Sequence, residues 1–310
     1  MEWRRMKAVI LAGGLGSRLS EETELKPKPM VEIGGQPILW HIMKIYSAYG
    51  VNDFVVCCGY KGHLIKQYFA DYFMHTSDVT FDLSSNRMLV HRVRSEPWKV
   101  TLVNTGAHSE TGGRLLKVRQ HLEPNEPFHF TYGDGVSNVD IAALSRFHAT
   151  AGTAATLTAV IPPSRFGALQ MEGNLVTQFL EKPAGEQGLI NGGYMVLSPR
   201  IFDFLDCDCS FESRIMPRLA EAEQLSAYTH TGFWHPMDTL RDKRHLEALW
   251  DSGRAPWKMW GENPHTNETT LDDRVQTSVV PSHDKLTAST PRIVRRGASI
   301  GIRRRNSAEF

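Results

Sequence analysis

The stretch Lys7-Ala-Val-Ile-Leu-Ala-Gly-Gly-Leu-Gly-Ser-Arg-Leu19 joins a short apolar run to a turn with three glycines in four residues. The apolar run predicts a buried β-strand over 7–11, and the glycines let the backbone turn tightly and direct N–H groups at an anion. The turn lacks the glycine and lysine spacing of a P-loop. It also lacks the third glycine of the dinucleotide-binding G-x-G-x-x-G pattern, because Leu19 stands in that place. We therefore predict a strand followed by a phosphate-binding turn, with an ordinary tight turn as the alternative.

Outward from this stretch, apolar runs alternate with helical patterns. Strands are expected at 54–58, 100–103, 128–132 and 155–161, and helices at 37–49, 64–73, 115–122 and 141–148. This alternation is typical of βαβ units, which build a largely parallel sheet covered on both faces. Short strands at 167–171, 175–180 and 194–197 then predict hairpins or an antiparallel part of the same sheet. A helix at 211–225, a strand at 227–233 and a helix after Asp238, with Thr239 and Asp242 as a capping box, complete the prediction.

Composition separates a folded region, 6–260, from a tail, 261–310. All seven tryptophans precede residue 261, whereas the tail has one aromatic residue, Phe310, and a basic end. We expect this tail to be mostly disordered. The chain carries 35 Lys and Arg against 34 Asp and Glu, which excludes nucleic-acid binding driven by overall charge. No apolar run approaches the roughly 20 residues of a membrane helix, and the apolar run 8–12 is too short for the hydrophobic part of a signal sequence. We therefore expect a cytoplasmic protein without a membrane partner.

The four cysteines form two close pairs, Cys57-Cys58 and Cys207-Asp-Cys209. Neither pair has the C-x-x-C spacing typical of zinc and redox sites, and adjacent cysteines rarely form a disulfide without strain. We expect all four to be small buried residues in a reducing compartment. The thirteen histidines show no H-x-x-x-H or H-E-x-x-H pattern. A zinc site is therefore not expected.

The stretch Leu25-Lys26-Pro-Lys28-Pro-Met30 alternates lysine with proline. Proline disfavours helix at the residue before it, so we predict an extended segment that places Lys26 and Lys28 on one face. An ordered lysine near the glycine-rich turn could bind a triphosphate, and the guanidinium of Arg18 could bind two phosphate oxygens. A surface linker with two solvated lysines is the alternative.

Two aspartates follow strands at the sheet edge where ligands bind in parallel sheets. Asp134 lies between two glycines after the strand at 128–132, and Asp238 lies at a strand-to-helix junction. Mg²⁺ takes one or two carboxylates together with phosphate oxygens and water, so the two aspartates are candidate Mg²⁺ ligands. The alternatives are a turn aspartate for Asp134 and a helix-capping acid for Asp238.

The glycine-rich stretch 11–19 followed by 26–30 resembles the signature of sugar-nucleotide pyrophosphorylases, the NDP-sugar nucleotidylyltransferases. The stretches 37–46, 58–62, 131–136 and 232–242 are most similar to members that act on CTP and α-D-glucose 1-phosphate. The resemblance covers residues 6–260. It implies an α/β three-layer sandwich with a mixed, mostly parallel central sheet, in which the N-terminal half binds nucleotide and the C-terminal half binds sugar phosphate. It also implies Mg²⁺ dependence, a homo-oligomer (trimer or hexamer), and formation of CDP-glucose and pyrophosphate without a covalent intermediate.

The resemblance further implies roles for individual residues. Arg18, Lys28 and Asp134 are expected to be catalytic, and Asp134 and Asp238 are expected to bind the metal. The expected nucleotide-binding residues are Leu11, Ala12, Gly13, Gly14, Gly16, Ser17, Arg18, Lys28, Thr111, Gly112 and Arg114. The expected sugar-phosphate-binding residues are Gly167, Glu181, Lys182, Asn191 and Gly192. Arg114 has an alternative interpretation as a solvated helix residue.

Three other functions stay open at this point. One is a uridylyl- or thymidylyltransferase that acts on a hexose 1-phosphate. Another is a non-catalytic NDP-sugar-binding subunit. Such a subunit would lack at least one of Arg18, Lys28, Asp134 and Asp238, but all four are present. A nucleotide-dependent oxidoreductase is disfavoured by the missing third glycine. The chain departs from the family's usual pattern in the 206–209 run, in Phe211 before Glu212, and in its tail.

Overall fold

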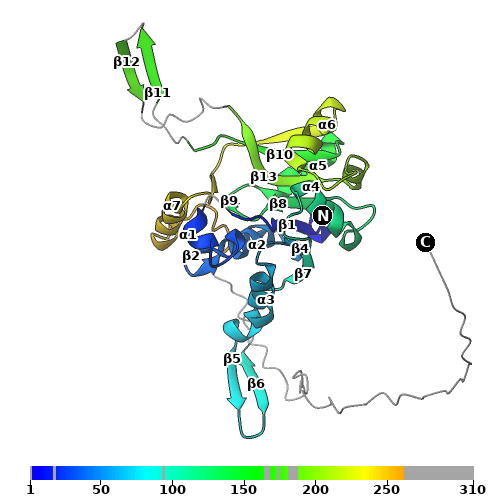
Figure 1. Cartoon of the computed structure of the whole chain (residues 1–310), viewed down its shortest axis with the longest axis vertical. Coiled ribbons are helices and arrows are strands. Elements are labelled where there is room, and N and C mark those ends of the chain that lie inside the picture. Colours follow the sequence, from blue (N-terminus) through cyan, green and yellow to red (C-terminus); the bar gives the residue numbers. More distant parts are fainter. Residues whose placement is uncertain are drawn as a thin grey trace, which may run out of the picture.

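A seven-stranded sheet forms the centre of the computed structural model (Figure 1), which describes residues 2–16, 19–92, 95–163, 168–172, 175–180 and 188–261. In spatial order the strands are β14 (Leu225–His230), β10 (Ala155–Val160), β13 (Ile190–Leu197), β8 (Phe128–Tyr132), β1 (Ala8–Ala12), β4 (Asp53–Cys58) and β7 (Lys99–Asn104). Strand β13 runs antiparallel to both of its neighbours, and the other neighbouring pairs are parallel. The prediction of a mixed, mostly parallel sheet is confirmed.

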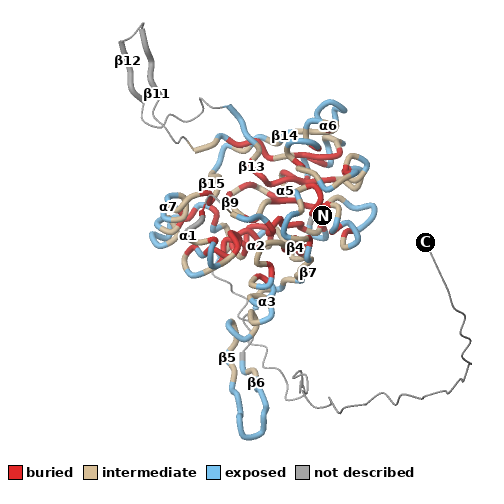
Figure 2. The backbone as a smooth tube through the Cα atoms, in the orientation of Figure 1, coloured by how far each residue is buried: buried red, intermediate tan, exposed pale blue. Residues whose placement is uncertain are grey.

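Helices cover both faces of this sheet. Successive side chains of a strand point to opposite faces, so an apolar strand contributes side chains to a core on each face. On β1, Ala8 and Ile10 pack into one core while Val9 and Leu11 pack into the other. The first core is completed by α2 (Ile38–Ala48), α3 (Gly62–Thr76), α5 (Ile141–Ala151) and α7 (Leu240–Asp251), and the second by α4 (Thr111–Val118) and α6 (Met216–Glu221). Burial on both faces explains why β1 and β4 are continuous apolar runs, and Figure 2 shows this buried centre. The predicted three layers are present.

Short elements connect these layers. In the described part of the chain, 3-10 turns lie at η1 (Glu2–Arg5), η3 (Lys28–Met30), η4 (Arg119–His121) and η5 (Pro199–Asp203), and α1 spans Ser20–Thr23. Two small antiparallel ladders pair β2 (Glu32–Ile33) with β3 (Gln36–Pro37), and β9 (Gly135–Ser137) with β15 (Trp234–Pro236). The predicted capping box of Thr239 and Asp242 opens α7. Among the described residues, no helix combines the length and apolar character needed to cross a membrane.

The helix predicted over 211–225 is wrong in its extent. The chain forms a π-helical turn, η6 (Phe211–Ile215), and then α6, which ends at Glu221. Glu223 adopts the left-handed region with φ 57°, and Leu225 already pairs with Ala155 of β10. Strand pairing with the central sheet therefore overrides the helical pattern of the last residues.

Two hairpins extend from the body of the molecule (Figure 1). The predicted antiparallel segment is the pair β11 (Ala168–Glu172) and β12 (Leu175–Leu180). The pair β5 (Asp78–Asp82) and β6 (Arg87–Arg92) was not predicted. Its turn is closed by Asp82, whose carboxylate accepts hydrogen bonds from Ser84 and Ser85. The tail predicted to be disordered lies outside the described residues from 262 onward.

Strand β8 places a histidine in the centre of the protein. His129 is completely buried, and within the described ranges neither ring nitrogen has a hydrogen-bond partner. Burial, followed by the charge of nearby His148, lowers the pKa of His129 from 6.5 to about 3. Below pH 6.5 the unfolded chain therefore binds a proton that the folded chain does not bind, and stability is lost as the pH falls from 6.5 toward 3.

We predict that His129→Phe makes the free energy of unfolding less sensitive to acid. Phenylalanine keeps a ring of similar size and binds no proton, so the slope between pH 6 and pH 4 should fall by about 1.4 kcal/mol per pH unit. Urea denaturation at a series of pH values measures this slope. His63→Phe, which removes an exposed histidine, is the control. An unchanged slope in His129→Phe would contradict the interpretation.

Candidate active site

A short backbone ladder brings the two predicted metal-binding aspartates together. Asp134 directly precedes β9, and Asp238 follows β15. In this ladder Gly135 pairs with Pro236, and the backbone N–H of Met237 donates to the carbonyl oxygen of Asp134 at 2.7 Å. The pairing of two segments that are distant in sequence therefore fixes both carboxylates in one place.

The ammonium group of Lys28 lies between these two carboxylates. Its Nζ donates to Oδ2 of Asp134 at 2.8 Å and to Oδ1 of Asp238 at 2.7 Å. The Lys28 side chain is 9% exposed, whereas that of Asp134 is 34% exposed. Burial by itself lowers the pKa of Lys28, but the charges and hydrogen bonds of Asp134 and Asp238 outweigh burial and raise the pKa above 10.5. Lys28 is therefore positively charged throughout the neutral range.

The pair Asp134 and Asp238 fits a divalent metal ion. Both carboxylates already gather around one positive charge, and their bonding oxygens can be no farther apart than the sum of their two distances to Nζ. Mg²⁺ prefers such hard oxygen ligands and keeps its other positions for water and phosphate oxygens. The exposed side of Asp134 leaves room for these further ligands.

The segment that carries Lys28 differs from the extended chain that its prolines predict. Pro27 is extended, with φ −67° and ψ 149°, but η3 starts at Lys28. This turn directs Lys28 inward, while Lys26 stays near the surface and pairs with Glu32 at 2.8 Å. The prediction that the two lysines share a face is therefore wrong. The φ that proline fixes suits the first turn of a helix as well as extended chain.

A pocket of about 330 Å³ lies beside Lys28. Its wall is built by the glycine-rich turn after β1, η3, the start of α4 and the end of β8. The predicted site residues that line it are Leu11, Gly13, Gly14, Gly16, Lys28, Thr111, Arg114 and Asp134. The carboxyl ends of β1 and β8 thus meet at one site, as expected for ligand binding by a parallel sheet.

Arg114 fastens the glycine-rich turn to α4. Its guanidinium donates to the carbonyl oxygens of Gly13 at 2.9 Å, Gly106 at 2.8 Å and Ala107 at 3.3 Å, and to Oγ1 of Thr105 at 2.8 Å. Arg114 is 4% exposed, so its interpretation as a solvated helix residue is wrong. A Cβ on Gly13 would lie 2.0 Å from the guanidinium. A side chain at position 13 would therefore displace the guanidinium from these hydrogen bonds.

Glu212, which the sequence did not predict as a site residue, links two sides of the site. Its carboxylate accepts hydrogen bonds from Oγ1 of Thr111 and from the Tyr132 hydroxyl, both at 2.6 Å. Asn191 in turn donates to the Tyr132 hydroxyl at 3.3 Å. Burial, followed by the Glu212 charge, raises the pKa of Tyr132, so the hydroxyl keeps its proton and remains a donor. In the sequence, Glu212 is a polar residue that follows the apolar Phe211 after a turn. This local pattern alone only weakly indicates a site residue.

The remaining predicted site residues divide into two groups. Ala12 is buried at the end of β1, the N–H of Gly112 donates to the carbonyl oxygen of Cys209 at 2.9 Å, and the Gly192 carbonyl accepts from Trp234 Nε1 at 2.6 Å. These residues hold the walls of the site together. The residues that lie outside the described part of the chain are Ser17, Arg18, Gly167, Glu181 and Lys182.

Comparison with known proteins shows similarity in sequence and similarity in fold, of which the sequence similarity covers most of the chain. The family model described as nucleotidyl transferase matches residues 7–240. A glucose-1-phosphate cytidylyltransferase of Salmonella typhi is 59% identical over 256 residues, which cover 82% of this chain and 100% of that protein. A probable glucose-1-phosphate cytidylyltransferase of Bacillus subtilis (strain 168) is 43% identical over 257 residues, with the same coverage.

Solved structures share the fold. HddC from Yersinia pseudotuberculosis superposes with a TM-score of 0.57 and 23% identity, covering 79% of this chain and 99% of that chain. A UDP-glucose pyrophosphorylase complexed with UDP-glucose superposes with a TM-score of 0.55 and 17% identity, covering 80% of this chain and 99% of that chain. At these identities the structures support the α/β architecture alone.

We predict that Arg114→Met lowers the free energy of unfolding by about 2–4 kcal/mol. Methionine keeps part of the buried stem but removes the guanidinium donor of the Gly106 and Ala107 carbonyl oxygens, while the Gly13 carbonyl keeps its bond from the Tyr60 N–H. Each unsatisfied buried group costs about 1–3 kcal/mol. Urea denaturation measures the change. Lys117→Met removes a half-exposed cation one turn further along α4 and should cost less than about 1 kcal/mol. Equal losses in the two variants would refute the fastening role of Arg114.

Proposed function

We propose that this chain, which belongs to the nucleotidyl transferase family, transfers the cytidylyl group of CTP to α-D-glucose 1-phosphate and releases pyrophosphate. The observation that carries the proposal is the Lys28 ammonium, held by Asp134 and Asp238 beside the pocket of the glycine-rich turn. The choice of substrates follows the Salmonella typhi relative, whose whole length this chain covers at 59% identity. The product would be CDP-glucose.

In the proposed reaction, a phosphate oxygen of the sugar phosphate attacks the α-phosphorus of CTP in line, and pyrophosphate leaves on the opposite side. A phosphate monoester dianion is already a nucleophile, so the chain needs no general base and forms no covalent intermediate. Its work is placement and charge neutralisation. The glycine-rich turn would direct backbone N–H groups to the triphosphate. Lys28 would neutralise charge at the α-phosphate, and Arg18 would stabilise the departing pyrophosphate.

Asp134 and Asp238 are the residues we propose to hold Mg²⁺. When bound, the ion supplies positive charge to the phosphate oxygens. Lys28 keeps the two carboxylates side by side before substrate arrives, because its single charge offsets their repulsion. The convergence of three charged side chains on one point supports this assignment.

The two substrates would bind on either side of Tyr132. Thr111, Gly112 and Arg114 shape the proposed nucleotide side, and Asn191 and Gly192 belong to the proposed sugar-phosphate side, together with Gly167, Glu181 and Lys182. The hydrogen bonds of Tyr132 to Glu212 and Asn191 connect the two sides. Glu212 is therefore a positioning residue in the proposal.

We also propose that the chain forms a homo-oligomer, a trimer or hexamer, through the β5–β6 hairpin. This hairpin leaves the body of the molecule (Figure 2) and exposes Phe81, Leu83, Met88 and Leu89 by 54%, 89%, 45% and 60%. An isolated two-stranded ribbon is only marginally stable in water. Large exposed apolar side chains gathered on one ribbon indicate a protein partner, for which we propose a second copy of this chain.

The reaction is tested by incubating the purified chain with glucose 1-phosphate, Mg²⁺ and CTP, UTP or dTTP in turn, and measuring pyrophosphate. We expect turnover with CTP to exceed that with UTP or dTTP. Asp134→Ala should reduce kcat by at least about 10²–10³-fold, the effect of losing one electrostatic stabiliser. Asp251→Ala, which removes an exposed acid at the end of α7, is the control. Near-normal turnover of Asp134→Ala would refute the metal assignment, and equal use of UTP would refute the choice of CTP.

The oligomer is tested by sedimentation of the double variant Leu83→Gln and Leu89→Gln. Polar side chains at the tip and on β6 should weaken association, so the fraction of oligomer at a fixed protein concentration should fall. Leu25→Gln changes a leucine that is 79% exposed but lies away from the hairpin, and it should have no effect. A monomeric parent protein, or a double variant with the parent's mass, would overturn this proposal.

A further inference from the structure

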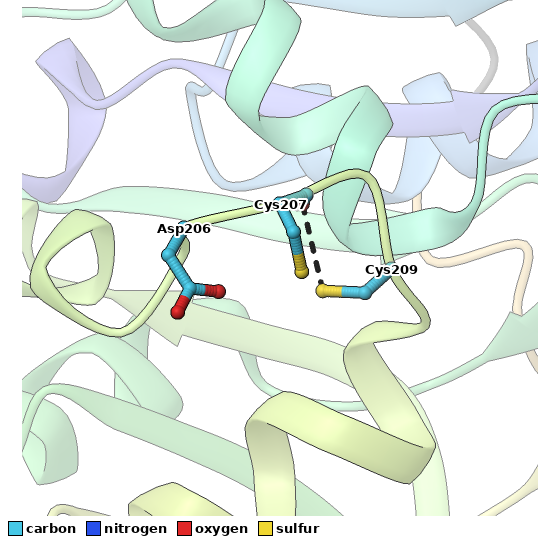
Figure 3. Close-up of side chains that lie close together, drawn as sticks. All are labelled: Asp206, Cys207 and Cys209. Atoms are coloured by element: carbon cyan, nitrogen blue, oxygen red, sulfur yellow. Dashed lines mark hydrogen bonds between the residues drawn. The ribbon is translucent and has the colours of Figure 1, made fainter.

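The loop between η5 and η6 gathers one carboxylate and two thiols that the proposed reaction does not use. An oxygen of Asp206 and the sulfur atoms of Cys207 and Cys209 all lie within 4.8 Å of one another. Figure 3 shows the two sulfur atoms facing each other on one side of the loop, with the Asp206 carboxylate on the same side. The three donors come from a stretch of four residues, so one local loop conformation is enough to gather them.

These cysteines differ from the buried pair. Cys57 and Cys58 are buried, as predicted, and burial raises the pKa of Cys58 to about 11. Cys207 and Cys209 are only half-buried, so the prediction that all four are buried is wrong for this pair. The Asp206 side chain beside them is 56% exposed, so an ion from solution can reach the cluster from that side.

We propose that Asp206, Cys207 and Cys209 form a binding site for a thiophilic divalent cation of the Zn²⁺ type, with water as the fourth ligand. Zn²⁺ binds cysteine sulfur at about 2.3 Å and carboxylate oxygen at about 2.0–2.2 Å in tetrahedral geometry. Ligand atoms on such an ion lie roughly 3.5–4 Å apart, so the loop needs to tighten only slightly. Thiolates favour Zn²⁺ over Mg²⁺, which distinguishes this site from the pair Asp134 and Asp238.

The charges around the loop suit this ion. On binding, the two thiols release their protons to solvent, and two thiolates with one carboxylate leave the ion complex with one net negative charge. Arg214 and Arg218 lie 3.7 Å and 3.5 Å from the Asp206 carboxylate, so they offset that charge. Arg218 is held in place, since it donates to the carbonyl oxygen of Phe204 at 2.8 Å. Such outer hydrogen-bond partners orient metal ligands.

The loop also supports the pocket wall. The carbonyl oxygen of Cys209 accepts from the N–H of Gly112 at 2.9 Å, and Asp208 accepts from the N–H of Glu110 at 2.8 Å. Both donors belong to the start of α4, next to Thr111. A bound ion would therefore fix the loop on which this part of the pocket rests. The proposal of this cation site does not depend on which nucleotide the chain uses.

The test titrates the reduced, chelator-treated full-length chain with Co²⁺ and then with Zn²⁺. We expect one thiolate-bound ion per chain, seen as a thiolate-to-cobalt charge-transfer absorption, and loss of that absorption when Zn²⁺ displaces Co²⁺. The double variant Cys207→Ser and Cys209→Ser should lose the absorption and bind at least ten-fold more weakly. Asp206→Asn should keep the absorption with weaker binding. Asp134→Asn, which alters the other acidic site, should show the same charge-transfer absorption as the parent.

Several results would overturn the proposal. They are absence of the absorption in the reduced parent chain, an unchanged absorption in the double cysteine variant, and loss of the absorption in Asp134→Asn. A Cys207–Cys209 disulfide found by mass spectrometry after exposure to a low-molecular-weight disulfide, with no ion bound by the reduced chain, would also overturn it. The circular dichroism of each variant separates lost binding from lost folding, and Asp206→Asn keeps both thiols if the double variant does not fold.

Discussion

The hydrogen bonds of one lysine to two aspartates hold the candidate active site together. Lys28 comes from the turn after the glycine-rich loop, Asp134 from the end of β8 and Asp238 from the start of the segment leading into α7. Without the ammonium, two carboxylates at this separation would repel each other and resist ionisation. With it, the cluster keeps one net negative charge, which favours a further cation on the exposed side of Asp134.

Close approach of backbones determines where glycine is required around this cluster. A Cβ on Gly59 would lie 2.6 Å from the carbonyl oxygen of Gly13, and one on Gly133 would lie 2.6 Å from that of Leu11. The carboxyl ends of β1, β4 and β8 can therefore come together only because residues without side chains follow them. The same close packing leaves space for the pocket in front of Lys28.

Sequence patterns predicted the elements that are buried on both faces and the residues at their ends. Continuous apolar runs predicted β1, β4 and β8, and the rule that ligands bind at the carboxyl ends of parallel strands predicted that Asp134 and Asp238 lie at one site. The β5–β6 hairpin was missed although Asp78–Asp82 alternates polar and apolar residues, because a five-residue run outside the strand–helix alternation of the central sheet is only a weak local signal. The burial of Arg114 and the hydrogen bonds of Glu212 depend on contacts between distant segments, which a local pattern does not contain.

The bonds of Arg114 to the glycine-rich turn affect the thermodynamics of ligand capture. Glycine-rich chain has high conformational entropy when free, and ordering it at the moment of binding would weaken affinity. Here the guanidinium donates to the carbonyl of Gly13 within the folded chain. Much of this ordering is therefore completed during folding, and the turn meets an incoming anion in a preorganised shape.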